Sequence, residues 1–229
     1  MATLPGPPLR AVVFDIDGTL YPIRQIVRRS WPLVCRHARL FGAFGRARRV
    51  LRGERPGTGL RQRQAELVAG YLGIDTATAA EAVERVVYRQ WPRTFRRLQP
   101  YSEVAATLAR LRADGLRLGV VSDSPFTHEK LAALGLEAGW GGVVSADQAG
   151  ALKPNPEPFL LILRLLQVRP EEVLFVGNSY IHDMIGAHRV GMRAAHLTRY
   201  PVTSGVAAVS FPNYRSFPEI PLGVRRVAS

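Results

Sequence analysis

The stretch LRAVVFDIDGTL, residues 9–20, decides the fold class of this chain. Its first six residues, LRAVVF, are mostly apolar and partly β-branched, which is typical of a short strand buried inside a sheet. Asp15 and Asp17 follow directly, and the chain can turn at Gly18. The stretch therefore predicts a buried strand with two carboxylates at its carboxyl end. An Asp-Gly hairpin turn is the alternative, but Pro22 and a helical pattern stand where its second strand would have to lie.

Strand-like and helical segments alternate along the chain from residue 100 onward. Repeated strand–helix units with nearly continuous apolar strands favour a parallel sheet covered by helices on both faces, which is an α/β fold. Ligands of such sheets bind beyond the carboxyl ends of the strands. Asp15, Ser122 and Asn178 each follow a different predicted strand, so we expect their side chains to meet at one edge of the sheet. The further strands are predicted at residues 116–121, 142–145, 172–176, 194–197 and 206–210.

The segment between the first strand and residue 100 has helical periodicity. Three helices are predicted there, over residues 27–41, 60–72 and 75–91. The apolar face of the first is predicted to consist of Val27, Trp31, Val34, Ala38 and Phe41. Three aromatic residues are expected in the core of this segment rather than in contact with a substrate: Phe41, Phe44 and Trp91.

The net charge of the chain is concentrated in the same segment. The whole chain has 31 basic and 18 acidic residues, a net charge of +13, and Lys130 and Lys153 are its only lysines. Residues 22–99 hold 17 arginines and five acidic residues, which is +12. Such a surface is either a solvated helical face or a site that attracts phosphorylated small molecules, nucleic acid or anionic lipid. The arginines that are candidates, as a class, for a substrate clamp are Arg46, Arg48, Arg49, Arg52, Arg61, Arg63, Arg93, Arg96 and Arg97.

Composition favours a cytoplasmic protein without a membrane partner. A chain of 229 residues can bury a sizeable core, and no apolar run is long enough to cross a bilayer. Residues 1–8 do not have the pattern of a signal peptide. Cys35 is the single cysteine, so no intrachain disulfide can form. We predict a cytoplasmic location and either a monomer or a homodimer.

The residues at the strand ends suit phosphate chemistry. Two carboxylates as close as Asp15 and Asp17 repel each other, which raises the pKa of one of them. One can then stay ionised while the other is available as a proton donor. The Ser122 hydroxyl can bond phosphate oxygens, and the ammonium of Lys153 can neutralise their charge as a compact point charge.

The segment GNSYIHD, residues 177–183, adds candidate metal ligands. Magnesium prefers hard oxygen ligands and takes few of them from the protein. Asp15, the backbone carbonyl of Asp17, and the side chain of Asn178 or Asp183 would supply such a set. The alternative is that Asn178 or Ser179 caps the following helix.

Four motifs occur in a fixed order: DIDGTL at residues 15–20, a strand ending at Ser122, KPNPEPF at residues 153–159 and GNSYIHDMIGA at residues 177–187. In this order they resemble the haloacid dehalogenase-like (HAD) superfamily, and the resemblance covers the whole chain. The first and third motifs are specific, whereas the second alone is weak. The resemblance implies a five-stranded Rossmann-like core, formed by residues 1–20 and 100–229, and a helical cap inserted at residues 21–99.

The resemblance also implies a role for each matching residue. Asp15 would attack phosphorus and form an aspartyl-phosphate, while Asp17 would protonate the leaving oxygen and then activate water. Ser122 and Lys153 would hold the phosphoryl oxygens, with Mg2+ as cofactor. Further substrate contacts are expected from Gly18, Thr19 and Asp123. The expected metal ligands are Asp15, Asp17, Asn178 and Asp183.

The predicted function is a Mg2+-dependent phosphatase that acts on a small phosphorylated metabolite such as phosphoglycolate, a sugar phosphate or a nucleoside monophosphate. Two alternatives remain: a phosphomutase, which shares every motif, and a catalytically weak module whose arginines bind nucleic acid or an acidic partner. The dehalogenases of the family lack an acid two residues after the nucleophile, so Asp17 argues against them. Asn178 stands where the family commonly has an acid, which removes one negative charge from the metal site and gives Asp183 more weight.

Overall fold

The computed structural model describes residues 6–200 and 205–217, so residues 1–5, 201–204 and 218–229 of the predicted core lie outside it. The strands are β1 (Ala11–Phe14), β2 (Arg117–Ser122), β3 (Gly142–Ser145), β4 (Val173–Gly177), β5 (Arg193–Leu197) and β6 (Val209–Phe211). The α-helices are α1 (Arg24–Arg36), α2 (Ala38–Leu51), α3 (Leu60–Leu72), α4 (Thr76–Ala82), α5 (Val104–Ala113), α6 (Thr127–Ala133), α7 (Ala146–Ala149), α8 (Pro156–Leu166) and α9 (Ile185–Arg189). Short 3-10 or π-helical segments are η1 (Gly57–Gly59), η2 (Val83–Gln90), η3 (Trp91–Phe95), η4 (Pro170–Glu172) and η5 (Tyr180–Met184). Within these described ranges, none of the helices has the length and apolar character that spanning a bilayer requires.

The strands form one sheet in the order β3-β2-β1-β4-β5-β6, and every neighbouring pair is parallel. This arrangement confirms the predicted α/β fold. The implied number of five strands is wrong, because β6 adds a sixth at the edge, in register with β5 from Ala195–Val209 to Leu197–Phe211. The reason is that Phe211 is only 3% exposed and packs into the core beside β5. Burial of that ring keeps the returning chain against the sheet edge.

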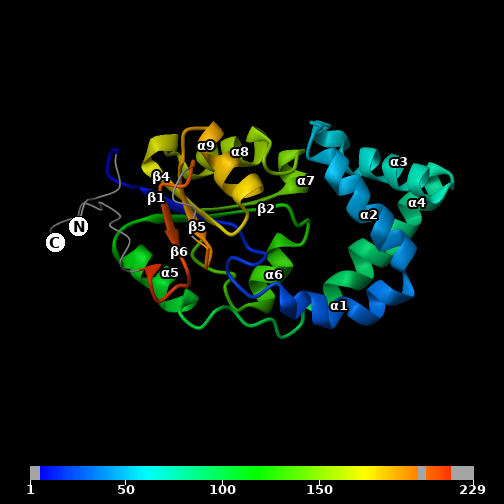
Figure 1. Cartoon of the computed structure of the whole chain (residues 1–229), viewed down its shortest axis with the longest axis horizontal. Helices are drawn as coiled ribbons and strands as arrows, with labels where there is room; N and C mark the ends of the chain where they lie inside the picture. The colour runs from blue at the N-terminus through cyan, green and yellow to red at the C-terminus, as the bar shows by residue number, and fades with distance from the viewer. Residues whose placement is uncertain (1–5, 201–204, 218–229) are drawn as a thin grey trace.

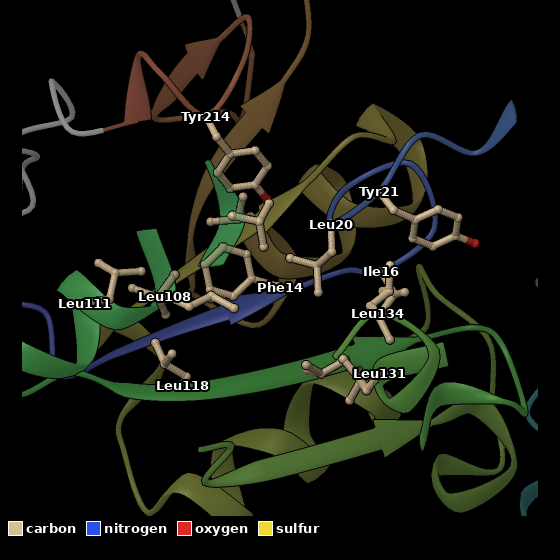
Figure 2. Packing of buried hydrophobic residues seen from close by; sticks show 14 of the residues in the cluster. Phe14, Ile16, Leu20, Tyr21, Leu108, Leu111, Leu118, Leu131, Leu134 and Tyr214 are labelled. Atoms are coloured by element: carbon tan, nitrogen blue, oxygen red, sulfur yellow. The ribbon is translucent and has the colours of Figure 1, made fainter. Parts of the chain in front are cut away.

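The two faces of the sheet bury separate clusters because side chains alternate along β1. Val12 and Phe14 point into one cluster, with α5 and α6, and Ala11 and Val13 point into the other, with α8 and α9. All four side chains are fully buried. Figure 1 shows α8 and α9 on one side of the sheet and α5 and α6 on the other. Figure 2 shows the first cluster, in which Phe14 lies among leucines of α5, α6 and β2.

The helical insert, residues 24–95 from α1 to η3, has its own core and lies to one side of the sheet (Figure 1). The predicted helix over residues 60–72 matches α3, which ends at Gly73 in a left-handed conformation with φ of 68°. The predicted helix over residues 75–91 corresponds to α4 followed without a break by the π-helical η2, which together run from Thr76 to Gln90, and η3 begins at Trp91. At its start the side chain of Asp75 caps α4 by accepting a hydrogen bond from the N–H of Thr78.

The predicted continuous helix over residues 27–41 is wrong, because two helices occupy this stretch. The chain bends at His37, where φ of −121° and ψ of 35° separate α1 from α2. Because of this bend the five apolar residues predicted for one helix face do not all point into the core of the insert. Val27 and Trp31 are instead 56% and 62% exposed. The buried face of α1 instead contains Ile26 and Ser30.

Candidate active site

The carboxyl end of β1 positions Asp15. Its backbone N–H donates to the carbonyl of Val176 in β4 at 2.9 Å, so the residue remains attached to the centre of the sheet. The chain then turns at Gly18, whose φ of 85° favours glycine and where a β-carbon would collide with the amide of Asn178. The turn brings the hydroxyl of Thr19 to 2.9 Å from Asp15 Oδ2, to which it donates. One carboxylate oxygen is thus held by its own turn.

Lys153 holds the other oxygen of Asp15 and joins it to Asp183. Its Nζ lies 2.7 Å from Asp15 Oδ1 and 2.6 Å from Asp183 Oδ1. Burial raises the pKa of Asp15 to about 7, an effect that Lys153 opposes and Asp183 strengthens. Burial also disfavours the charged form of Lys153, but Asp15 and Asp183 outweigh it and raise the pKa of this ammonium. The three side chains form a buried cluster of one cation between two carboxylates.

Asp17 faces the other lysine of the chain. Lys130 Nζ lies 2.8 Å from Asp17 Oδ1 and 2.6 Å from Oδ2, and the Tyr21 hydroxyl donates to Oδ1 as well. Lys130 is 3% exposed, whereas the side chain of Asp17 remains 28% exposed. Burial and the nearby Asp17 raise the pKa of Tyr21, so its hydroxyl keeps its proton and remains a donor. The two aspartates of the DIDG turn therefore each have their own lysine.

A cavity of about 260 Å³ lies over this turn, between the sheet edge and the helical insert. Both aspartates, both lysines and Asn178 contribute to its wall. Asp15 and Asn178 were expected to meet there from the strand ends, whereas Lys130 was not expected. The insert contributes two arginines and two aromatic rings. Its described lining residues are Asp15, Asp17, Phe44, Arg48, Arg52, Trp91, Asp123, Ser124, Pro125, Lys130, Lys153, Asn178, Ser179, His182 and Asp183.

Asp123 connects the sheet edge to the insert. Its carboxylate accepts the backbone N–H of Lys153 at 2.8 Å and pairs with Arg52, and its carbonyl accepts from Arg48. Burial raises the pKa of Asp123, but the cations Lys153, Arg52 and Arg48 outweigh burial and lower it. In this structure the carboxylate predicted to contact substrate is therefore engaged by protein groups.

Three other residues predicted to contact substrate lie beside the cavity rather than in its wall. Thr19 is fully buried and bonds Asp15, as described above. Ser122 is 1% exposed, and its hydroxyl accepts the N–H of Ser124 at 3.1 Å. Gly18 borders a neighbouring hollow at the other side of Asn178.

The side chains near Asp15 include oxygen atoms of the type that magnesium takes as ligands. The Thr19 hydroxyl lies 2.9 Å from Asp15 Oδ2 and 3.3 Å from Asn178 Oδ1, so it holds these two hard oxygens near each other. Asp183 is less free, because Oδ1 is bonded to Lys153 and Oδ2 accepts the N–H of Ser179 at 2.9 Å. The described residues contain no group of three or more His, Cys, Asp or Glu side chains placed so that they could hold a metal ion.

Several residues of the site have no individual role in the sequence prediction. Lys130 and Tyr21 both bond Asp17. The one sequence signal that could have pointed to Lys130 is the rarity of lysine, since the chain has two lysines beside 29 arginines. Arg48 and Arg52 reach the cavity from α2, but nothing in the sequence distinguishes them from the seven other candidate arginines. The insert's aromatic residues were expected in its core rather than near a substrate. This is incomplete, because Phe44 and Trp91 belong to the core and also line the cavity.

Comparison with known proteins places this site in a family. Residues 9–191 match the family model described as haloacid dehalogenase-like hydrolase. The chain is 30% identical over 205 residues to a glyceraldehyde 3-phosphate phosphatase of Methanopyrus kandleri, covering 83% of this chain and 84% of the relative. It is 31% identical over 232 residues to a phosphoglycolate phosphatase of Salmonella paratyphi A, covering 93% and 91%.

The fold is also shared with solved structures. A 2-haloacid dehalogenase from Pseudomonas syringae superposes with a TM-score of 0.66 at 24% identity, covering 93% of this chain and 97% of that one. At this identity the likeness shows the fold alone. The matches to the family model and to the two phosphatases confirm the predicted family and enzyme class, and the chain belongs to the haloacid dehalogenase-like hydrolases.

Proposed function

We propose that this protein is a Mg2+-dependent phosphomonoesterase that hydrolyses a small phosphorylated metabolite through an aspartyl-phosphate on Asp15. The observation that carries the proposal is the pairing of the two aspartates in one cavity. Asp15 is 6% exposed and held by Lys153 and Thr19, and Asp17 lies two residues away in the same wall. A fixed nucleophile beside a second carboxyl group is the arrangement that covalent phosphoryl transfer needs.

The proposed reaction has two steps. A carboxylate oxygen of Asp15 attacks phosphorus, the bond from phosphorus to the ester oxygen breaks, and Asp17 gives its proton to that leaving oxygen. Water then attacks the phosphorus of the aspartyl-phosphate and gives a proton to Asp17. The bond from phosphorus to Asp15 breaks, which restores the carboxylate and releases inorganic phosphate.

The cations of the cavity neutralise the phosphoryl group during both steps. Lys153 is 2% exposed and already lies within hydrogen-bond distance of Asp15, so it stays beside the attacking oxygen. Asp15, the carbonyl of Asp17 and Asn178 would hold the metal, with Asp183 beside them. When bound, Mg2+ supplies Lewis-acid stabilisation of the phosphoryl oxygens.

The size and lining of the cavity support a small substrate. Phosphoglycolate and glyceraldehyde 3-phosphate, which appear in the names of the relatives, are compact phosphate monoesters, and a cavity of about 260 Å³ suits molecules of this kind.

We propose that residues 21–99 act as a cap over the core formed by residues 1–20 and 100–229. Arg48 and Arg52 are then the cap residues nearest to a bound anion, and their contacts with Asp123 hold the cap against the core. A cytoplasmic location agrees with a single, unpaired Cys35.

The test is a Mg2+-supplemented screen of an aryl phosphate, phosphoglycolate, glyceraldehyde 3-phosphate, sugar phosphates and nucleoside monophosphates. We expect phosphate release that Asp15→Asn abolishes and that the exposed control Glu137→Gln leaves unchanged. Isomerisation of a sugar phosphate without release would instead identify a phosphomutase. The absence of any turnover, together with salt-sensitive retention of DNA or RNA, would replace the enzyme by a binding module.

A further inference from the structure

Lys130 occupies a position in the site that neither the nucleophile nor the metal explains. It belongs to α6, 113 residues after Asp17, and its Nζ contacts both oxygens of that carboxylate. The Tyr21 hydroxyl bonds Oδ1 as well. Lys130 is nearly inaccessible, yet it contributes to the wall of the cavity that Asp17 also lines. The carboxyl group is therefore restrained by two donors while part of it still faces the cavity.

A contribution to stability alone does not account for this ion pair. Buried ion pairs lose so much solvation that apolar residues of similar size often stabilise a fold equally well. The chain uses arginine for 29 of its 31 basic residues, and both of its lysines pair with the aspartates of one turn. A compact ammonium is used at these two places only, where a carboxylate beside the cavity has to be held.

The surroundings of Lys130 fix its ammonium as well. Its Nζ lies 5.3 Å from the ring centroid of Phe95, in the segment where the helical insert returns to the core. Phe95 in turn packs against Phe126 at 5.5 Å between centroids, just before α6. Both rings are almost completely buried. The ammonium therefore has little freedom, and it transmits that restraint to Asp17.

We propose that Lys130 is the positioning residue of Asp17, holding its carboxyl group at the cavity wall so that its proton reaches the leaving oxygen. The inference rests on the proposed function, in which Asp17 is the acid of the first step. A general acid acts only within hydrogen-bond reach of the atom that it protonates, and it contributes about 10² to 10⁴ in rate. A misplacement of about 1 Å costs about 100-fold. The effect of losing Lys130 must then depend on how much the leaving oxygen needs a proton.

The experiment compares two substrates in the first turnover. A nitrophenyl phosphate releases a stable phenolate and needs no acid, whereas an alkyl phosphate releases an alkoxide that must be protonated. In Lys130→Met we expect the first-turnover rate on the alkyl phosphate to fall by about 100-fold, while the burst on nitrophenyl phosphate changes little. Lys130→Arg keeps the charge and its donors and should restore part of the alkyl phosphate rate. The first turnover is used because hydrolysis of the aspartyl-phosphate needs Asp17 with either substrate.

Two further variants separate positioning from folding. Arg61→Met removes another ion pair between insert and core, with Asp147, which lies outside the cavity lining and should leave the ratio of the two rates unchanged. Tyr21→Phe removes only the second donor to Asp17 and should show the same selective loss, even if Lys130→Met does not fold. Equal losses on both substrates, or no loss on the alkyl phosphate, would overturn the inference. If the wild-type protein releases neither leaving group, or if Asp15→Asn stays active, the proposed function itself fails.

Discussion

Replacing Lys153 by methionine removes the only cation of a buried cluster and should destabilise the protein in a pH-dependent way. Nζ lies 2.7 Å from Asp15 and 2.6 Å from Asp183, and all three residues are at most 6% exposed. Breaking a buried ion pair by removing one partner costs about 3–5 kcal/mol, because the remaining charge is left without compensation. Here two carboxylates lose their shared partner, so we expect a loss at the upper end of that range near pH 8.

The sign of the pH dependence follows from Asp15. Burial already raises its pKa from 3.8 to about 7, and removing Lys153 raises it further, because Lys153 is the group that lowers it. A raised carboxyl pKa means that the folded state binds the proton more tightly than the unfolded state. Stability associated with this group is therefore present below about pH 4 and is lost as the pH rises through about 7. The deficit of Lys153→Met should be small at pH 4 and largest at pH 8.

Urea denaturation followed by tryptophan fluorescence measures this difference. Wild type and Lys153→Met are compared at pH 4, 6 and 8, with chelator present so that no metal takes the place of the ammonium. Adding Asp183→Asn to the variant should recover part of the loss, because one of the two uncompensated carboxylates is removed. Arg89→Met, which breaks an exposed ion pair with Glu84, serves as the control and should change stability little. A deficit that is the same at every pH would refute this account of the cluster.

Two further predictions concern the same site. Asp15→Asn should gain stability relative to the metal-free wild type as the pH rises from about 4 to about 7, by up to about 4 kcal/mol. The reason is that it removes the carboxyl group whose pKa burial raises to about 7. Paired urea titrations measure this difference in stability, and a difference that does not change with pH would contradict the prediction. Asn178→Asp should lower the Mg2+ concentration for half-maximal activity by about tenfold. The reason is that it adds a negative charge to the side chain whose Oδ1, like Asp15 Oδ2, lies beside the Thr19 hydroxyl. Calorimetric Mg2+ titration of both proteins checks it, and unchanged affinity would place the ion elsewhere.

The strand ends were predictable from the sequence because burial leaves a short, local signal. The run before Asp15 is apolar enough to be a central strand, and parallel strands bring their carboxyl ends to one edge. The meeting of Asp15 and Asn178 follows from that rule. Lys153 lies between α7 and α8 and follows no strand, so its place in the site was expected from its motif.

The partners of Asp17 and the cavity-lining arginines of the insert were not predictable in the same way. Lys130 reaches Asp17 across 113 residues through a short helix, and no local pattern reports such a contact. Arg48 and Arg52 face the cavity because the chain bends at His37 and rotates α2 relative to α1. The same bend exposes Trp31, which the periodicity had placed in the core. Contacts of this kind depend on the angle between helices, which sequence spacing does not encode.

When all its groups are ionised, the described wall of the cavity is electrically balanced, since it has four acidic side chains (Asp15, Asp17, Asp123 and Asp183) and four cations (Arg48, Arg52, Lys130 and Lys153). Burial lowers the pKa of His182, with Arg52 adding to the effect, so its ring brings no further charge at neutral pH. A phosphate dianion entering alone would leave this compartment with an excess of two negative charges, and a divalent ion entering alone would leave the opposite excess. Ester and magnesium should therefore strengthen each other's binding, and by thermodynamic reciprocity the factor must be the same in both directions.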